Sequence, residues 1–529
     1  MTPTDAVSGV DAGNDRDARR WSLTATLCAL LGAALVLWIV LQVPGEVFNN
    51  GDGGLKALQA KQAAAGDFGL GLHLPAPQWV RAQWMRGHYP FEPPFVYPMA
   101  AGHPKTVEQV PTFPFLFPWL SALPYRALGF RGFFVLPALA LFALWACFWL
   151  VARRAGVPVR WRAVALASLV LASPLTPYGA MFYEHTLTVL LLFPACAVAA
   201  LPPRQLTARR LALAGALAGI APWMRAESWC LLAGLGLLAA LRLVRERDRR
   251  WAWLPAGALL TAGADLVANH ALYGSWFGPH GELVLRTFSL QQQLARAIHH
   301  LGSSLRQMAV FEPLLLALVA AVAAVVASRR SLPRGALAVA GLVVFDLAAV
   351  PFVLPVSVGL HWGPRYLLVL MPLLSLLLSL LLPALAALPR LLRLALGCAL
   401  AVALGFGAWK NSVEGTRQLV DNYRHRVWPA LAELQAAPDR VVVVNDSYCS
   451  TDLAALLADK PFLLAHGAQD LGDLASVLAR RGQPRFLFVV FPFQPMPPRF
   501  AWGAPDRRTA CAVRGERGQF LLYDCAGTP

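Results

Sequence analysis

Five short stretches of the sequence place acidic, basic or imidazole side chains next to long apolar runs. A carboxylate in such a place can act as a general base, and an arginine can hold a phosphate through two parallel hydrogen bonds. An ionisable group near the bilayer costs about 2.5 to 3.5 kcal/mol on insertion scales, so each one needs a partner or a purpose. The set is suited to the transfer of a group from an anionic lipid donor. The residues are Asp52; Glu184 and His185; Arg225 and Glu227; His280 and Glu282; and His361 and Arg365.

Each stretch also has a purely structural explanation. Asp52, in "NNGDGGLK", could cap the helix that follows, because Asp is a favoured N-cap residue, and the glycines beside it would equally let a bulky substrate approach the backbone. Arg225 and Glu227 could pair with each other. Arg365, in "WGPRY", could be an interfacial residue whose charge reaches water past an apolar stem. Glu184 and His185 could simply lie in a solvated turn, and His280 could be an ordinary loop histidine.

The composition is that of a polytopic membrane protein. Of the 529 residues, 57% are hydrophobic and only 14% are charged, against roughly 25% charged residues in soluble domains. Apolar runs of about 20 residues, the length that crosses a ~30 Å hydrocarbon core, recur along the chain. The first run, Trp21 to Val43, lacks the small-residue cleavage site of a signal peptide, so we expect it to be retained as a helix.

The basic residues indicate an orientation rather than a nucleic-acid partner. The net charge of +17 is spread over the gaps between apolar runs and is not gathered in one basic domain. With the tail 1–20 in the cytoplasm, alternate connections are rich in arginine, whereas the opposite short loops hold only Arg225 and Arg365. The positive-inside rule then places all five stretches on the outer face, where they could form one site.

About eleven transmembrane helices must position these side chains. Long outer connections are expected at 44–131 and 273–312, the second with an amphipathic helix on the outer surface. Asp265, Asn269 and Asp346 fall inside helices and are expected to make polar contacts between them. The helices are predicted near 22–43, 132–152, 163–178, 186–202, 211–223, 229–241, 252–272, 313–328, 335–355, 366–386 and 391–409.

The chain changes character at residue 410. Short β-branched and aromatic runs such as "RVVVVNDSY" and "RFLFVVFPF" alternate with helical stretches, which predicts a small α/β domain over 410–529 on the periplasmic side. "RTACAVRGERGQFLLYDC" predicts a hairpin that turns near Gly515 to Gly518, and whether Cys511 and Cys525 are bonded across it is left open. Asp446 is interpreted as a turn carboxylate rather than a nucleotide site, because no glycine-rich phosphate loop accompanies it.

This organisation resembles the GT-C superfamily of integral-membrane glycosyltransferases. The resemblance rests on an acidic residue directly after the first helix, a long aromatic-rich first loop, about eleven helices and an outer C-terminal domain. Its short motifs are "NNGDGGLKALQAK", "YEHTL" and "WGPRYLL", and it covers roughly residues 20 to 410. The resemblance is strongest to the bacterial members of the superfamily, of the mannosyltransferase and aminoarabinose-transferase type. It implies an all-α polytopic membrane domain, 21–409, that carries the catalytic site.

The resemblance also implies an activity. A member of this group would transfer a sugar, with inversion, from a polyprenyl-phosphate carrier to a glycan, lipid or protein acceptor at the periplasmic face of the bacterial inner membrane. Asp52 matches the family's first-loop catalytic acidic residue and would be the general base, while Arg365 would hold the donor phosphate. Glu184 and His185 would complete the catalytic group, and Arg225, Glu227, His280 and His361 would bind substrate.

Two points separate this sequence from a simple family assignment. Many relatives carry a paired Asp-Glu in the first loop, whereas Asp52 is followed by Gly53, and no clear Asp-x-Asp is present beside it. An obligatory metal or other cofactor is therefore not expected. The alternative function is a lipid-linked glycan flippase or transporter, but such proteins are expected to have internal repeats and substrate groups near the membrane midplane, and the hydropathy of this chain shows no repeat.

Overall fold

The structure, a computed structural model, divides the chain into two compact units. The first unit combines Met1–Val40 with Phe134–Arg417, and the second combines Leu41–Phe133 with Gln418–Pro529. Three of the predicted site residues, His280, Glu282 and His361, lie outside the described residues. The described residues are 4–98, 109–279, 281, 289–353, 362–438, 441–491 and 509–527.

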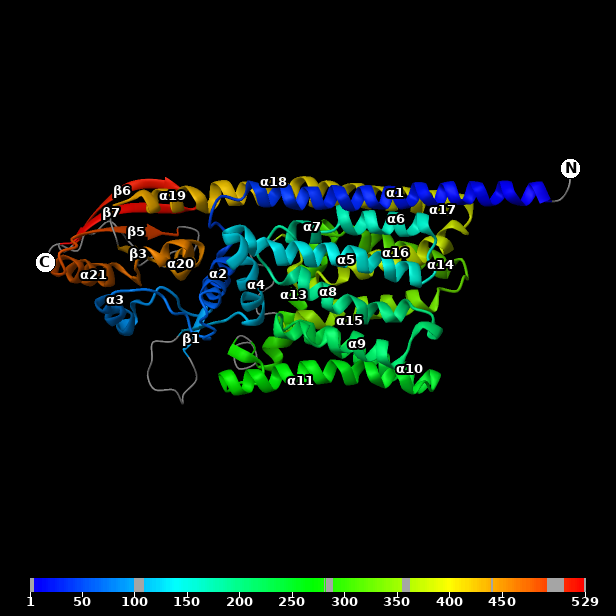
Figure 1. Cartoon of the computed structure of the whole chain (residues 1–529), viewed down its shortest axis with the longest axis horizontal. Helices are drawn as coiled ribbons and strands as arrows, with labels where there is room; N and C mark the ends of the chain where they lie inside the picture. The colour runs from blue at the N-terminus through cyan, green and yellow to red at the C-terminus, as the bar shows by residue number, and fades with distance from the viewer. Residues whose placement is uncertain are drawn as a thin grey trace. The chain divides into compact units, whose positions relative to one another are not determined.

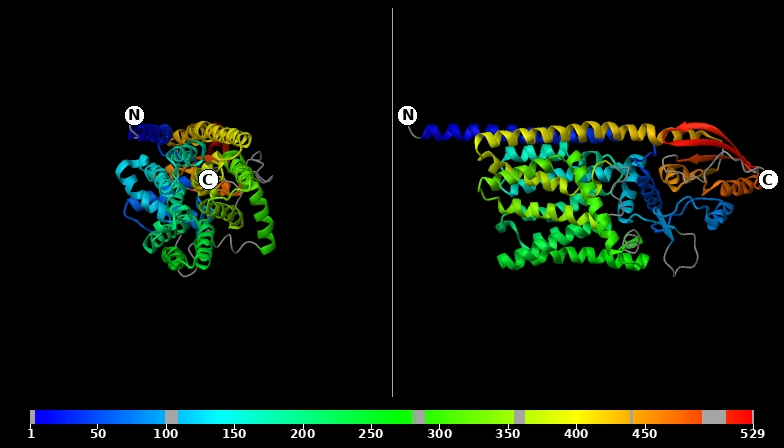
Figure 2. Two further views of the ribbon diagram at one scale, coloured as in Figure 1. Left: turned by 90° about the vertical axis from the view of Figure 1, so that its right-hand side faces the viewer. Right: turned by 180° about the vertical axis from the view of Figure 1, so that it is seen from behind.

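The first unit is a bundle of helices that run side by side (Figures 1 and 2). Helical structure is found in each of the eleven predicted ranges, with breaks in two of them. Within the described residues, six helical stretches of the chain are long and apolar enough to cross a membrane, or seven if the pair Leu290–Phe311 and Leu314–Ala327, bent by 94°, forms one span. The helices are α1 (Thr4–Gln42), α5 (Val135–Arg154), α6 (Val159–Ala167), α7 (Leu175–Tyr178), α8 (His185–Ala197), α9 (Ala208–Ala218), α10 (Ser228–Glu246), α11 (Trp253–Tyr273), α13 (Leu290–Phe311), α14 (Leu314–Ala327), α15 (Arg334–Val353), α16 (Leu370–Ala386) and α17 (Arg390–Ala408).

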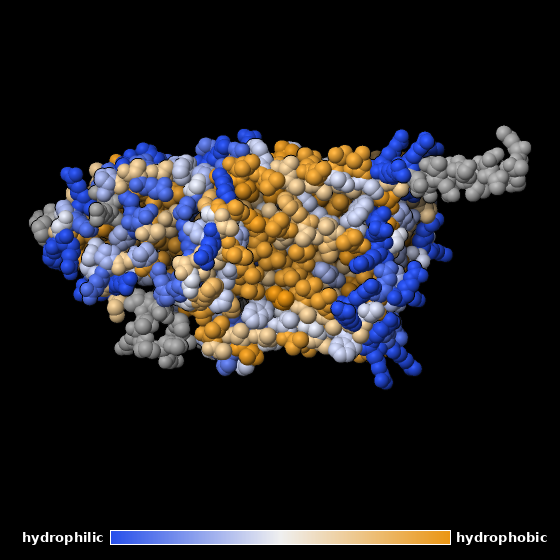
Figure 3. Space-filling view, in the orientation of Figure 1, coloured by the Kyte–Doolittle hydropathy of each residue, from blue (hydrophilic) through white to orange (hydrophobic). Residues whose placement is uncertain are grey.

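The surface of this unit has the distribution expected of a membrane domain. Hydrophobic residues form a continuous band over the visible side of the bundle, and hydrophilic residues gather at its right-hand end in this view (Figure 3). The central helix α16, "LMPLLSLLLSLLLPALA", is buried almost throughout. Its apolar sequence does not by itself require this position, because lipid can also cover an apolar helix, and the equally apolar α14 is partly exposed.

Two predicted helices are interrupted, and the interruptions carry the candidate site. The predicted helix 163–178 consists of α6, a π-helical turn (Ser168–Ala172) and α7, because Pro174 follows an extended Ser173. The predicted helix 211–223 is α-helical only as far as Ala218, and Pro222 lies in a 3-10 turn after it. Irregular backbone at membrane depth is tolerated only where protein buries it or where it lines a cavity. The interruptions are therefore natural places for functional side chains.

The second unit contains the first loop and the C-terminal α/β domain. Its sheet has the order β4-β3-β5-β7-β6, with β3 parallel to β4 and β5 and the last strands antiparallel, and this confirms the small strand-containing domain at the C-terminus. The elements of the loop are α2 (Gly51–Ala64), α3 (Gln78–Gln83), β1 (Val96–Pro98), β2 (Gln109–Pro111) and α4 (Leu116–Leu128). Those of the tail are α18 (Gly415–Asp421), α19 (Trp428–Ala436), β3 (Val442–Val444), α20 (Ser447–Asp452), β4 (Phe462–Leu464), α21 (Ala468–Arg480), β5 (Arg485–Val490), β6 (Thr509–Arg517) and β7 (Phe520–Gly527).

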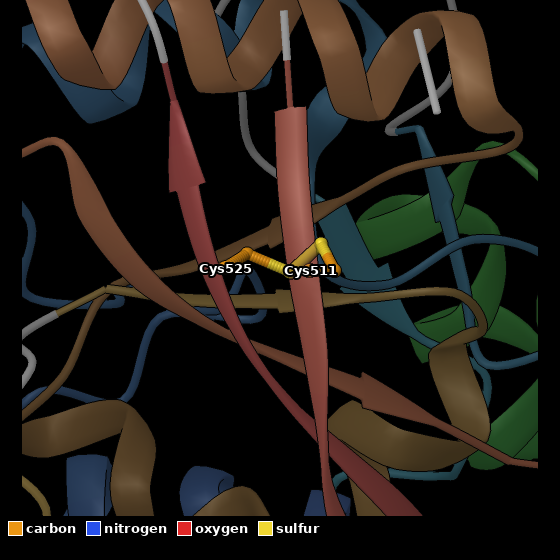
Figure 4. The surroundings of a disulfide bond; sticks show 2 residues. All are labelled: Cys511 and Cys525. Atoms are coloured by element: carbon orange, nitrogen blue, oxygen red, sulfur yellow. A yellow bond between two sulfur atoms is a disulfide. The ribbon is translucent and has the colours of Figure 1, made fainter. Parts of the chain in front are cut away.

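The C-terminal hairpin matches its prediction closely. Strands β6 and β7 pair antiparallel, with the turn at Gly518, whose φ of +61° suits glycine. Cys511 and Cys525 are direct partners in the register and form a disulfide (Figure 4). Asp446 is a turn carboxylate, since its side chain caps α20 by accepting a hydrogen bond of 2.8 Å from the Tyr448 amide.

Candidate functional site

Arg225, which follows the second interrupted helix, makes two ion pairs. Arg225 Nη1 donates to Glu184 Oε1 over 2.9 Å, and its Nε donates to Glu227. All three side chains are at most 15% exposed. Burial lowers the pKa of Arg225, but the carboxylates of Glu227 and Glu184 raise it more, so the pKa lies above its ordinary value. The predicted pairing of Arg225 with Glu227 is confirmed, and Glu184 is a second partner that the sequence did not indicate.

Helix ends place the two carboxylates. Glu184 is the residue before α8, and Glu227 is the residue before α10. The partial positive charge of each helix N-terminus stabilises a carboxylate in that position. Arg225 follows the 3-10 turn that contains Pro222, so its side chain belongs to irregular backbone and can reach both helix ends.

A small cavity of about 30 Å³ lies beside this cluster. That volume has room for one or two water molecules, so in this state it is smaller than a sugar or a phosphate headgroup. Its apolar walls include Val189, Leu192 and Leu231. The polar groups that line it are His185, Thr188, Arg225, Glu227, Ser228, Asp346, Arg365 and Tyr366.

Tyr366 lies against both cavity arginines. Arg365 Nη2 donates to the Tyr366 hydroxyl over 2.6 Å, and the Arg365 guanidinium lies 4.6 Å from the centre of the Tyr366 ring. The Arg225 guanidinium is 5.5 Å from the same ring. Cation–π contacts of this kind orient a guanidinium without neutralising its charge. Arg365 is therefore held by an aromatic hydroxyl and a ring, whereas Arg225 is held by two carboxylates.

Aromatic side chains fix His185. Its ring centre is 4.8 Å from that of Tyr178 and 5.2 Å from that of Tyr183, which meets it edge-on. The Tyr178 hydroxyl in turn donates to the Trp362 carbonyl over 2.9 Å. Trp362 precedes Arg365 in "WGPRY", so a chain of contacts leads from the "YEHTL" motif to the "WGPRYLL" motif. The two motifs, far apart in the sequence, belong to one cluster in the first unit.

Asp346 is a cavity residue that sequence reasoning assigned differently. It was expected to make a polar contact between helices, but its buried side chain, on α15, lines the cavity with Arg225 and Arg365. The available signal was a single carboxylate within the apolar run "GLVVFDLAAV". Such a residue is a functional candidate by default, because it faces a bundle interior or a cavity.

Asp52 lies in the second unit, in the first turn of α2. The N-cap residue of this helix is Asn50, so the proposal that Asp52 caps it is wrong. Asp52 is partly buried, and a carboxylate in a first turn is stabilised by the helix dipole. Lys56, one turn later, is only 2% exposed and lies 4.5 Å from the Phe113 ring centre. Sequence reasoning missed Lys56, although it stands four residues after Asp52 and so on the same helix face.

The glycines around Asp52 pack against the α/β domain of the same unit. A Cβ atom at Gly51 would lie 2.1 Å from Thr451 Oγ1, and one at Gly54 would lie 2.0 Å from the Thr451 carbonyl oxygen. The expected space for a bulky substrate beside these two glycines is therefore occupied by α20. Only glycine permits this approach of two backbones.

The single site predicted from the sequence stays a prediction. The structure brings together Glu184, His185, Arg225, Glu227 and Arg365 in the first unit, and it places Asp52 in the second. Within the ranges that the structure describes, no group of three or more His, Cys, Asp and Glu residues could hold a metal ion.

Comparison with solved structures identifies the fold. The chain is similar to ArnT from Cupriavidus metallidurans bound to undecaprenyl phosphate, with a TM-score of 0.52 and 14% identity over 94% of this chain and 97% of that chain. The apo form of ArnT gives a TM-score of 0.50 and 13% identity over 94% and 98%. No protein-family model matches the chain, and no curated protein matches it. At this identity the likeness establishes the fold alone. It confirms the predicted fold, a polytopic helical membrane domain like that of ArnT with a small C-terminal domain.

Proposed function

We propose that this protein transfers a sugar from a polyprenyl-phosphate carrier to a cell-envelope acceptor at the periplasmic face of the inner membrane. The observation that carries the proposal is the ArnT fold, which extends over 94% of the chain and whose matched structure holds undecaprenyl phosphate. The polar groups of the candidate site, two arginines with carboxylates, a histidine and a tyrosine, suit a phosphate-linked donor.

Asp52 acts as the general base in this proposal. Its carboxylate accepts the proton of an acceptor hydroxyl as that oxygen attacks the anomeric carbon, and the bond from the anomeric carbon to the phosphate oxygen breaks with inversion. The polyprenyl phosphate leaves with the electron pair of that bond. General-base assistance of this kind typically contributes 10²- to 10⁴-fold to the rate.

Arg365 binds the donor phosphate in this proposal. Its guanidinium lines the cavity and is oriented by the hydroxyl and ring of Tyr366. Arg225 makes ion pairs with Glu184 and Glu227, and a phosphate at that position would have to compete with both. Glu184 and Glu227 then position Arg225 and the end of α8, while His185 lines the same cavity.

The experiment compares Asp52→Asn with the parent in proteoliposomes that contain undecaprenyl-phosphate sugars labelled in the sugar. Asn is nearly isosteric with Asp, so the variant is expected to keep the parent's melting temperature and to lose at least 100-fold in transfer rate. Asp67→Asn is the matched control, because Asp67 lies in the same loop and its exposed carboxylate pairs with His73. Transfer by Asp52→Asn at the parent rate would remove the base assignment. Movement of labelled lipid between leaflets, without transfer to any acceptor, would instead favour the flippase.

A further inference from the structure

The C-terminal domain contributes a buried carboxylate to the surroundings of Asp52. Asp452, the last residue of α20, has a side chain that is 2% exposed. Its Oδ1 atom lies 3.3 Å from the position that a Cβ at Gly51 would occupy, so this oxygen faces the first turn of α2. Among the described residues, Oδ1 has no hydrogen-bond partner. A buried carboxylate oxygen is thus directed at the helix turn that carries Asp52.

The other oxygen of Asp452 is held by the hairpin and by the segment before α19. Gln519 Nε2 donates to Asp452 Oδ2, and Arg426 Nη2 lies 3.9 Å from the same oxygen. Arg426 Nε also donates to Gln519 Oε1, and the Gln519 amide donates to the Arg426 carbonyl over 2.9 Å. The packing is equally close here, since a Cβ at Gly518 would lie 2.1 Å from the Arg426 carbonyl oxygen. These contacts give Asp452 one orientation.

Electrostatics connect the two carboxylates. Burial raises the pKa of Asp452 to about 6, Arg426 and Gln519 act to lower it, and the Asp52 carboxylate acts to raise it. Coulomb interactions are reciprocal, so a charged Asp452 must favour the protonated form of Asp52 to the same extent. The titratable groups around Asp452 are Asp52 on α2, Arg426 before α19 and Cys449 on α20 itself.

We propose that Asp452 is a positioning residue for Asp52, which fixes the first turn of α2 and adds a negative charge beside the general base. The inference rests on the proposed function and gives the α/β domain a role in the reaction. A base with a nearby negative charge holds a proton more strongly, and a stronger base assists the removal of a hydroxyl proton better.

The test is the pH dependence of kcat/KM for transfer by Asp452→Asn, in the full-length protein with an undecaprenyl-phosphate sugar that the parent uses. Asp452 carries its charge above about pH 6, and there kcat/KM of Asp452→Asn is expected to fall roughly twofold or more below that of the parent, because the base has lost a neighbouring negative charge. At lower pH, where Asp452 is protonated, the two profiles should converge. Arg426→Gln is expected to move the pH at which they diverge upward, since loss of the guanidinium raises the pKa of Asp452. Asp459→Asn, an exposed position in the same domain, should reproduce the parent profile. Identical profiles for parent, Asp452→Asn and Arg426→Gln would overturn the proposal.

A second measurement separates this proposal from the proposed function. The melting temperatures of the parent, Asp52→Asn, Asp452→Asn and the double variant form a cycle that requires no catalysis. At a pH above 7, Asp52→Asn should raise the melting temperature when residue 452 is Asp and should lose that gain when it is Asn. A zero coupling would overturn the contact between the carboxylates. A coupling that is present in a protein without transfer activity would refute the proposed function and leave the contact standing.

Discussion

Gly54→Ala tests whether the closeness of α2 and α20 matters for the reaction. The new Cβ would lie 2.0 Å from the Thr451 carbonyl oxygen, where ordinary contact begins at 3.4 Å, so the two helices must separate locally by about 1.4 Å. Overpacking typically costs about 1 to 3 kcal/mol, and alanine is better than glycine in a helix by about 1 kcal/mol. The free energy of unfolding should therefore fall by no more than about 2 kcal/mol. A displacement of about 1 Å near the chemistry costs about 100-fold in rate, so transfer should fall far more than stability does.

The assay measures chemical denaturation and the transfer rate on the same preparations. Gly45→Ala is the control, because a Cβ at Gly45 would meet nothing within 4 Å. Thr451→Ala should partly rescue Gly51→Ala, whose clash is with the Thr451 side chain, and should not rescue Gly54→Ala, whose clash is with backbone. Gly54→Ala with the parent's transfer rate would show that the position of α2 against α20 has no bearing on catalysis.

Two further predictions concern the ion pair of the first unit and the disulfide of the second. Glu184→Gln leaves Arg225 with one carboxylate in place of two and should lower the free energy of unfolding by about 1 to 3 kcal/mol. This is less than the cost of losing a buried pair completely, because Glu227 remains. The control Glu246→Gln breaks the more exposed pair with Arg242 and should cost less than about 1 kcal/mol, so equal effects of the two variants in denaturant titration would contradict the burial of the Arg225 pairs. Replacement of Cys511 and Cys525 by serine opens a loop with a sequence separation of 14 and should destabilise the C-terminal domain by about 3 kcal/mol. Cys398→Ser, at an exposed free cysteine, is the control, and an unchanged melting temperature on reduction of the parent would contradict this prediction.

The sequence alone determined the elements whose causes are local. Each predicted helix needed only an apolar run of membrane length, and the hairpin needed only alternation with a glycine at its turn. The pairing of Cys511 with Cys525 does not follow from that turn alone, because it also depends on a register shift between Val513 and Gly515. The breaks at Pro174 and Pro222 were not predicted. Proline alone does not locate such breaks, because Pro194, Pro351 and Pro383 lie inside the helices α8, α15 and α16.

Only the tertiary structure decided which side chains meet. Glu184 and Arg225 are 41 residues apart, and no local pattern distinguishes that pair from Arg225 with Glu227. The glycines of "NNGDGGLK" were compatible with the close approach of either a substrate or a helix. The contacts of Gly51 and Gly54 with Thr451, some 400 residues later in the chain, show that the approaching group is the helix α20. Asp346 was marked only by the apolar run around it, and nothing in the sequence distinguished Asp452 from other carboxylates of the C-terminal domain. Their positions depend on the packing of distant segments, which sequence periodicity does not encode, because periodicity specifies the buried face of an element but not its neighbour.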